Sequence, residues 1–82
     1  MTVRVLFFAY LRERCGVRET KLDLPTGATV GDSWQALRAR FEQLTPEPPR
    51  FAVNRVYVDK AHPLHDNDEL ALIPPVSGGI AS

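Results

Sequence analysis

Only one part of this 82-residue chain shows a long helical pattern, and strand patterns stand on both sides of it. Large apolar residues recur at helical spacing from Val30 to Phe41, with arginines on the opposite side. Alternating apolar residues indicate strands over residues 2–8 and 18–24, and three more short strands between residues 51 and 73. This order requires one helix to cross one face of a sheet, so we expect an α+β fold.

Local signals predict where the helices begin and end. Residues 9–16 form a short helical pattern, and Gly16 is expected to stop it. Thr29 and Asp32 approximate a capping box at the start of the main helix. The prolines of "TPEPPR", residues 45–50, are expected to end that helix, because proline cannot continue the hydrogen-bond ladder.

The resulting order of elements is strand, short helix, strand, long helix and three strands. The first and last strands of such a sheet are expected to lie parallel in its middle, which is the ubiquitin-like β-grasp arrangement. We therefore predict a mixed sheet of about five strands with one main and one short helix. The length supports a single domain. Residues 1–75 are assigned to it, and residues 76–82 to a flexible C-terminal tail that carries Gly-Gly.

The charge pattern argues against two classes of partner. Ten basic and ten acidic residues cancel, whereas a nucleic-acid surface needs a basic surplus. No polybasic stretch could hold a membrane surface, and Arg4 interrupts the apolar run near the N-terminus. We expect no nucleic-acid partner, no membrane association and a cytoplasmic location.

Side chains offer little for conventional catalysis. His62, His65, Asp66 and Asp68 share one loop, where such residues are common turn formers, and we expect no metal site there. Cys15 could be a nucleophile or a persulfide carrier, but it lies on the apolar side of the short helix and an inert thiol is expected. No phosphate-binding loop or dinucleotide motif is present. We expect no bound cofactor.

Alternation in the strands predicts an apolar patch on the outer face of the sheet. Val56 and Val58 are expected to face the core, which leaves Tyr57 outside. Phe8 and Ile73 fall on the same outer face if the first and last strands are neighbours. We interpret Phe8, Tyr57 and Ile73 as a surface that docks another protein.

The chain leaves the last strand beside this patch. Pro74 and Pro75 stop the strand and stiffen an extended exit, after which Val76 is the last bulky residue before Gly78-Gly79. Glycines lack Cβ, so such a tail could thread a narrow channel in a partner. The alternative is an ordinary frayed terminus.

Two segments, "VRVLFFAYLRE" and "AVNRVYVDKAHPLHDNDELALIPPVSGG", resemble the small, sulfur-carrying subunit of molybdopterin synthase. The resemblance implies that an adenylyltransferase similar to ubiquitin-activating enzymes uses ATP to adenylate Gly79, with Gly78 giving clearance. Sulfur then replaces AMP, and the glycyl thiocarboxylate donates it to a pterin precursor in the large subunit. Phe8, Tyr57 and Ile73 match the family's contact positions for both partners, and residues 74–76 its lead-in to the glycines. The chain is thus expected to be a carrier subunit rather than an enzyme by itself.

One feature departs from the family pattern, because residues 80–82 follow the second glycine and make Gly79 an internal amide. We expect a processing protease to trim them; alternatively they are a remnant of expression, or carrier chemistry has been lost. Other functions also stay open. The chain could donate sulfur to thiamine, thiolated tRNA or cysteine, could be a protein modifier, or could be a non-covalent β-grasp adaptor whose tail is inert.

Overall fold

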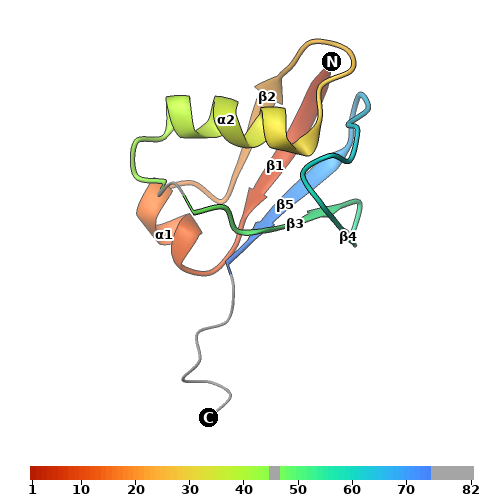
Figure 1. Ribbon diagram of the computed structural model, residues 1–82. Helices are drawn as coiled ribbons and strands as arrows, with labels where there is room; N and C mark the ends of the chain where they lie inside the picture. The colour runs from red at the N-terminus through yellow and green to blue at the C-terminus, as the bar shows by residue number, and fades with distance from the viewer. Residues whose placement is uncertain (45–46, 75–82) are drawn as a thin grey trace.

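Five strands form one mixed sheet in the computed structural model, which describes residues 1–44 and 47–74 (Figure 1). The strand order is β2-β1-β5-β3-β4. The elements in chain order are β1 (Thr2–Phe7), α1 (Tyr10–Cys15), β2 (Glu19–Asp23), α2 (Val30–Arg40), β3 (Arg50–Val53), β4 (Val56–Val58) and β5 (Glu69–Ile73). The predicted element order is therefore confirmed.

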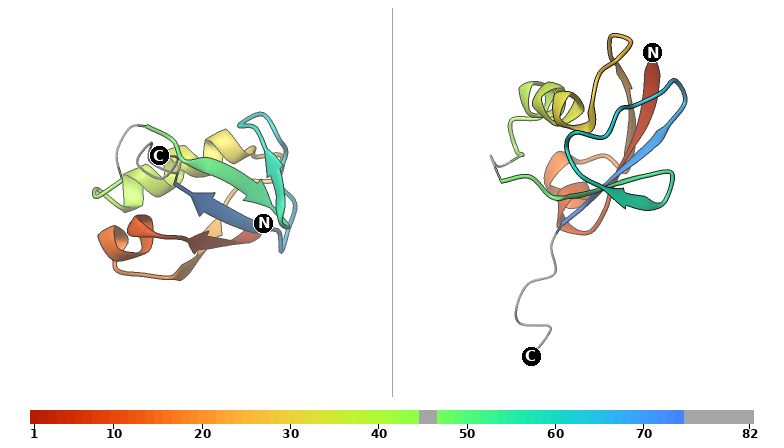
Figure 2. Two further views of the ribbon diagram at one scale, coloured as in Figure 1. Left: turned by 90° about the horizontal axis from the view of Figure 1, so that it is seen from below. Right: turned by 45° about the vertical axis from the view of Figure 1, so that its right-hand side comes forward.

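Strands β1 and β5 lie parallel, with Val5 opposite Leu70, and every other pair of neighbouring strands is antiparallel. Helix α2 crosses one face of this sheet, whereas α1 lies at the end of β1 (Figures 1 and 2). The first and last strands thus occupy the interior of the sheet, as the order of elements predicts. Among the described residues, no helix has the length and apolar character needed to cross a membrane.

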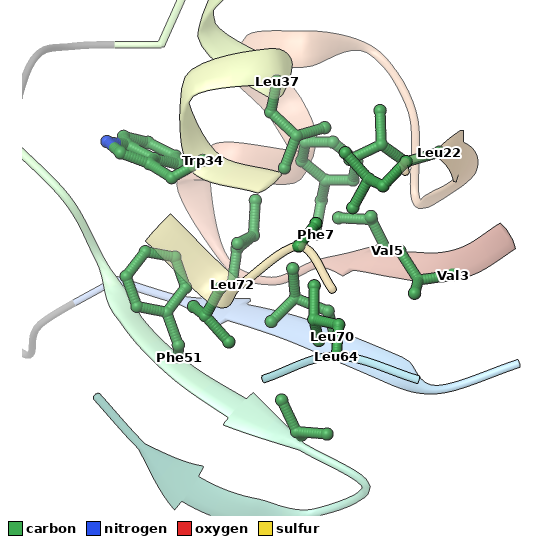
Figure 3. Packing of buried hydrophobic residues seen from close by; sticks show 14 of the residues in the cluster. Val3, Val5, Phe7, Leu22, Trp34, Leu37, Phe51, Leu64, Leu70 and Leu72 are labelled. Carbon is green, nitrogen blue, oxygen red and sulfur yellow. The ribbon is translucent and has the colours of Figure 1, made fainter. Parts of the chain in front are cut away.

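The core lies between α2 and the sheet. Figure 3 shows Trp34 and Leu37 of α2 pointing toward the apolar side chains of the strands. Trp34 meets the ring of Phe51 edge-on, with 5.9 Å between ring centroids. Each large apolar side chain that is fully buried stabilises the fold by about 1.5–3 kcal/mol. The labelled core residues are Val3, Val5, Phe7, Leu22, Trp34, Leu37, Phe51, Leu64, Leu70 and Leu72.

Both arms of the predicted capping box are present at the start of α2. The Asp32 N–H donates to Thr29 Oγ1 at 3.2 Å, and the Thr29 N–H donates to Asp32 Oδ2 at 2.9 Å. At the end of α1, Gly16 adopts the left-handed conformation with φ 75°, as its type predicts. These local signals stabilise the helix ends because they satisfy backbone groups that have no partner within the helix.

Helix α2 ends at Arg40, so the prediction that the proline segment ends it is wrong. Phe41 already has an extended backbone, with φ −116° and ψ 99°, although its N–H still donates to the Leu37 carbonyl at 2.7 Å. The Phe41 ring lies edge-on to Phe7, with 5.4 Å between centroids. A packing contact with β1 therefore accompanies the exit from the helix, before the first proline is reached.

Val56 faces the core side of the sheet, as predicted, but its side chain is 63% exposed. Val56 pairs with Val53, but β4 is a three-residue strand at the edge of the sheet. An edge position leaves the core-facing side of a strand partly uncovered, and Val58 is only half-buried. Asn54 and Arg55 form a tight turn before β4, with φ of 50° and 73°.

Candidate functional site

Three residues expected to form a docking patch line the same hollow on the outer face of the sheet. Phe8, Tyr57 and Ile73 border a space of about 350 Å³, and Phe8 and Tyr57 are 42% and 58% exposed. The full lining is Leu6, Phe8, Ala52, Arg55, Tyr57, Glu69, Ala71 and Ile73. Exposed aromatic side chains around a hollow are typical of protein interaction sites, where a few such residues supply most of the binding energy.

Strand register explains how residues distant in sequence come together here. Ala71 of β5 lies opposite Leu6 of β1 on one side and Ala52 of β3 on the other. Ala52 in turn pairs with Tyr57 of β4. Paired residues share a face of the sheet, so this row crosses the middle of the outer face. The two alanines lie next to each other in it, and their small side chains leave the space above them empty.

Phe8 is held beside β5 by the backbone. Its N–H donates to the Leu72 carbonyl at 3.3 Å, directly after the end of β1. Ala9 then adopts φ 52°, a conformation uncommon for residues other than glycine, and turns the chain into α1. The aromatic ring of Phe8 is thus displayed at the end of β1, close to the point where β5 ends.

One end of the hollow is polar. Arg4 and Glu69 are opposite each other in β1 and β5, and their side chains form an ion pair of 3.1 Å. The β3–β4 turn is tied to this point, because the Asn54 N–H donates to the Glu69 carbonyl and Asn54 Oδ1 accepts from the Glu69 N–H. Arg55 follows in that turn. On the other side of Tyr57, the Arg50 guanidinium lies over the ring at 4.5 Å from its centroid.

Of the other site residues predicted from the sequence, the structure describes Pro74. Pro74 is buried, so its ring is not exposed at the surface. Pro75, Val76, Gly78 and Gly79 lie outside the described residues, as does the whole predicted tail. The prediction from sequence did not include Leu6, Ala52, Arg55 and Ala71 in the site. These residues are small or face outward in adjacent strands, and only the strand pairing shows that they lie together.

Polar side chains of the 62–68 loop hold this loop in place through hydrogen bonds. Asp68 accepts hydrogen bonds from the His65 N–H at 2.8 Å and from the Asn54 amide at 2.9 Å, and Asp66 accepts one from the Thr2 N–H at 2.7 Å. Within residues 1–44 and 47–74, no cluster of three or more His, Cys, Asp or Glu side chains has the arrangement of a metal site. These polar side chains connect the loop to β1 and to the β3–β4 turn.

Cys15 is half-buried at the end of α1 and packs against the core. Burial raises the pKa of its thiol, and the positive charge of Arg14 lowers that pKa by a smaller amount. A raised pKa disfavours the thiolate, which is the form that acts as a nucleophile. At neutral pH the thiol therefore stays protonated.

Comparison with known proteins connects this geometry to a family. The ThiS family matches residues 5–79. A molybdopterin synthase sulfur carrier subunit of Drosophila yakuba is 40% identical over 96% of this chain and 92% of its own. The protein of the same description from Escherichia coli K12 is 38% identical over 94% of this chain and 99% of its own.

Solved structures of similar proteins confirm the ubiquitin-like β-grasp fold. SAMP1 of Haloferax volcanii, small archaeal modifier protein 1, has a TM-score of 0.87 and 30% identity over 96% of this chain and all of its own. Subunits 1 and 2 of the Helicobacter pylori molybdopterin-converting factor form a complex in which one chain matches with a TM-score of 0.68 and 26% identity, over 96% and 100% of the two lengths. A ubiquitin-like protein of Caldiarchaeum subterraneum, with a TM-score of 0.57 and 19% identity over 95% and 100% of the lengths, shows the fold alone.

Proposed function

The chain belongs to the ThiS family and resembles its molybdopterin synthase sulfur carrier subunits over nearly its whole length, and from this premise we propose that it carries sulfur on the carboxyl group of Gly79. The observation that carries the proposal is the extent of the family match. It runs to Gly79, the second residue of the Gly-Gly pair, and leaves residues 80–82 outside. In this proposal a protease removes those residues before the chain is loaded.

A free carboxylate is a poor electrophile, so the first step is its activation. An adenylyltransferase partner attaches the carboxylate oxygen to the α-phosphorus of ATP and releases pyrophosphate. A sulfide-equivalent nucleophile then attacks the carbonyl carbon, AMP leaves, and a thiocarboxylate remains. Activation by a better leaving group and generation of a reactive sulfur nucleophile are the usual logic of covalent catalysis. Because the activating step consumes ATP, we propose the cytoplasm as its location.

The second step is delivery to the large subunit. The thiocarboxylate sulfur attacks a carbon of the pterin precursor and displaces an oxygen substituent from it. Water then cleaves the bond between sulfur and the glycyl carbonyl, which leaves the sulfur on the precursor and regenerates the carboxylate for another round of loading. Two such rounds supply the two sulfurs of the dithiolene. The face bordered by Phe8, Tyr57 and Ile73 ends where the chain runs on toward Gly79, which supports a role in holding the partner while the tail reaches its pocket.

Intact mass spectrometry of the chain isolated from its own cells tests this proposal. A chain that ends at Gly79, with a fraction in which one oxygen is replaced by sulfur, is the expected result. A homogeneous chain that retains residues 80–82, and stays unmodified with its activating enzyme, ATP and sulfide, would contradict it. Two truncations give a matched comparison: a chain ending at Gly79 should be loaded without protease, and a chain ending at Ser77 should not.

Protein modification is a second candidate, and the likeness to the archaeal modifier SAMP1 favours it. A modifier uses the same carboxyl activation, but the acyl group passes to a lysine amine of another protein. The two functions differ in their products. A covalent conjugate that survives denaturation and contains Gly79 in an isopeptide bond indicates modification, whereas a thiocarboxylate without conjugates indicates sulfur transfer. A non-covalent adaptor is indicated if Gly79→Ala leaves function intact.

A further inference from the structure

The outer-face hollow has a floor of two small side chains inside a rim of large ones. Ala52 and Ala71 lie opposite each other in β3 and β5 and are only 5% and 6% exposed. Phe8, Tyr57 and Ile73 rise around them. A volume of about 350 Å³ lies near the lower end of the range of about 300–1,000 Å³ that is typical of ligand pockets. The hollow therefore has room for an inserted side chain.

The charged side chains at the polar end of the hollow differ in whether they form an ion pair. The carboxylate of Glu69 is neutralised by Arg4 at 3.1 Å. Arg55 also borders the hollow, and it forms no ion pair within 4 Å with any residue of the described ranges 1–44 and 47–74. The hollow thus combines an apolar floor with one unmatched positive charge at its rim. An occupant that matches both features carries an apolar side chain beside a carboxylate.

We propose that the hollow above Ala52 and Ala71 receives one bulky apolar side chain of the large subunit, and that Arg55 pairs with a carboxylate next to that side chain. This inference rests on the proposed function, which supplies the partner, and adds the chemistry that the partner surface must present. Buried anchors in well-formed pockets are the contacts that dominate interface energies, whereas charges at the rim mainly set the association rate. Ala52 and Ala71 therefore act as specificity residues for size, and Arg55 for charge.

Substitutions that fill the hollow test whether a side chain of the partner occupies it. In Ala71→Leu a larger side chain takes the space of the partner's anchor, so its dissociation constant for the large subunit is expected to rise by about tenfold or more. Ala52→Leu fills the same hollow from the neighbouring strand and covers the case in which one variant folds poorly. Ala39→Leu is the matched control, since Ala39 is exposed on α2. Calorimetric titration of the complex, with circular dichroism of each variant, gives the readout.

Reversing the charge of Arg55 tests whether this residue pairs with a carboxylate of the partner. Asp tolerates a positive φ better than most residues, so Arg55→Asp changes the charge without much added backbone strain at φ 73°. The association rate is expected to fall several-fold, and the difference should shrink as salt is raised. Arg40→Glu is the control, because Arg40 is exposed on α2, which covers the opposite face of the sheet.

The outcomes separate this inference from the function it rests on. If the wild-type chain binds the large subunit and the two filled variants bind equally well, the hollow is not the anchor site and the inference is wrong while the proposed function stands. If filling weakens binding but Arg55→Asp matches the control Arg40→Glu, the charge assignment is wrong. If the folded wild-type chain does not bind the large subunit at all, the proposed partner and this inference both fail.

Discussion

The two faces of strand β5 have different surroundings. Leu70 and Leu72 are completely buried against α2, whereas Glu69, Ala71 and Ile73 face a hollow that no other part of the described chain fills. A protein interior is packed about as densely as an organic crystal, so an apolar space left open next to a filled core stands out. One face of the sheet maintains the fold, whereas the other, in our proposal, receives a partner.

The placement of aromatic side chains follows the same division. Phe7 is buried in the core, and the next residue, Phe8, is largely exposed at the rim of the hollow. The rings of Trp34 and Phe51 pack edge-on in the core, whereas Tyr57 lies on the outer face with the Arg50 guanidinium over its ring. If this division is real, substitutions on the two faces should separate loss of stability from loss of binding.

The largest expected effect is on the core face. Trp34→Ala removes a buried ring that packs edge-on against Phe51, and should lower the free energy of unfolding by about 3–5 kcal/mol. Urea unfolding followed by circular dichroism measures this. Gln35→Ala, at the exposed neighbouring position of α2, is the control and should change stability by no more than about 0.5 kcal/mol. Equal effects of the two variants would contradict the assignment of the core.

On the outer face, Phe8→Ala and Ile73→Ala are expected to weaken the complex with the large subunit by about 1–2 kcal/mol or more. The unfolding free energy should fall by less than the Trp34 variant loses, because both side chains are partly exposed. Titration calorimetry gives the affinity. Tyr10→Ala removes an exposed aromatic side chain that does not line the hollow and is the matched control. Full retention of binding by the Phe8 and Ile73 variants counts against the docking face.

A smaller effect is expected where α2 begins above the core. Thr29→Ala removes the hydroxyl that accepts from the Asp32 N–H, and should cost about 1 kcal/mol of stability. Thr29→Ser keeps a hydroxyl and should retain most of it. Thermal unfolding of the three proteins under identical conditions measures the difference. If the alanine and serine variants melt together, the capping box does not stabilise the helix.

The smallest effect belongs to the ion pair on the outer face. Arg4 and Glu69 are partly exposed, with side chains 46% and 20% accessible, so their coupling should be about 0.2–1 kcal/mol and decrease with salt. A double-mutant cycle with Arg4→Ala and Glu69→Ala measures that coupling. A coupling well above this range would mean that the outer face also maintains the fold, and the division between the two faces would be weaker than described.

Much of the fold could be predicted from local patterns. Alternation located the strands, and Thr29 and Gly16 marked helix ends, because each signal depends on residues that are close in sequence. The end of α2 could not be predicted in this way, since Phe41 leaves the helix where it packs against Phe7. The exposure of Val56 depends on the edge position of β4, which a single strand pattern does not reveal.

Part of the candidate site could also be predicted from the sequence, and part could not. Phe8, Tyr57 and Ile73 could be predicted to share a face, because large apolar residues at outward positions are a strong signal. The hollow between them could not, because it arises from two alanines that meet only through the β3–β5 register. Arg55 was likewise recognisable as a turn residue, but its place at the rim depends on the hydrogen bonds between Asn54 and Glu69.

Methyl nuclear magnetic resonance of the complex tests the central claim, that the outer face of the sheet is the docking surface. The chain offers alanine methyl groups on both sides: Ala52 and Ala71 in the floor of the hollow, and Ala39 exposed on α2. On addition of the large subunit, the Ala52 and Ala71 signals should shift or broaden while Ala39 stays unchanged. A shift of Ala39 with unchanged Ala52 and Ala71 would place the partner on the helical side and contradict the account.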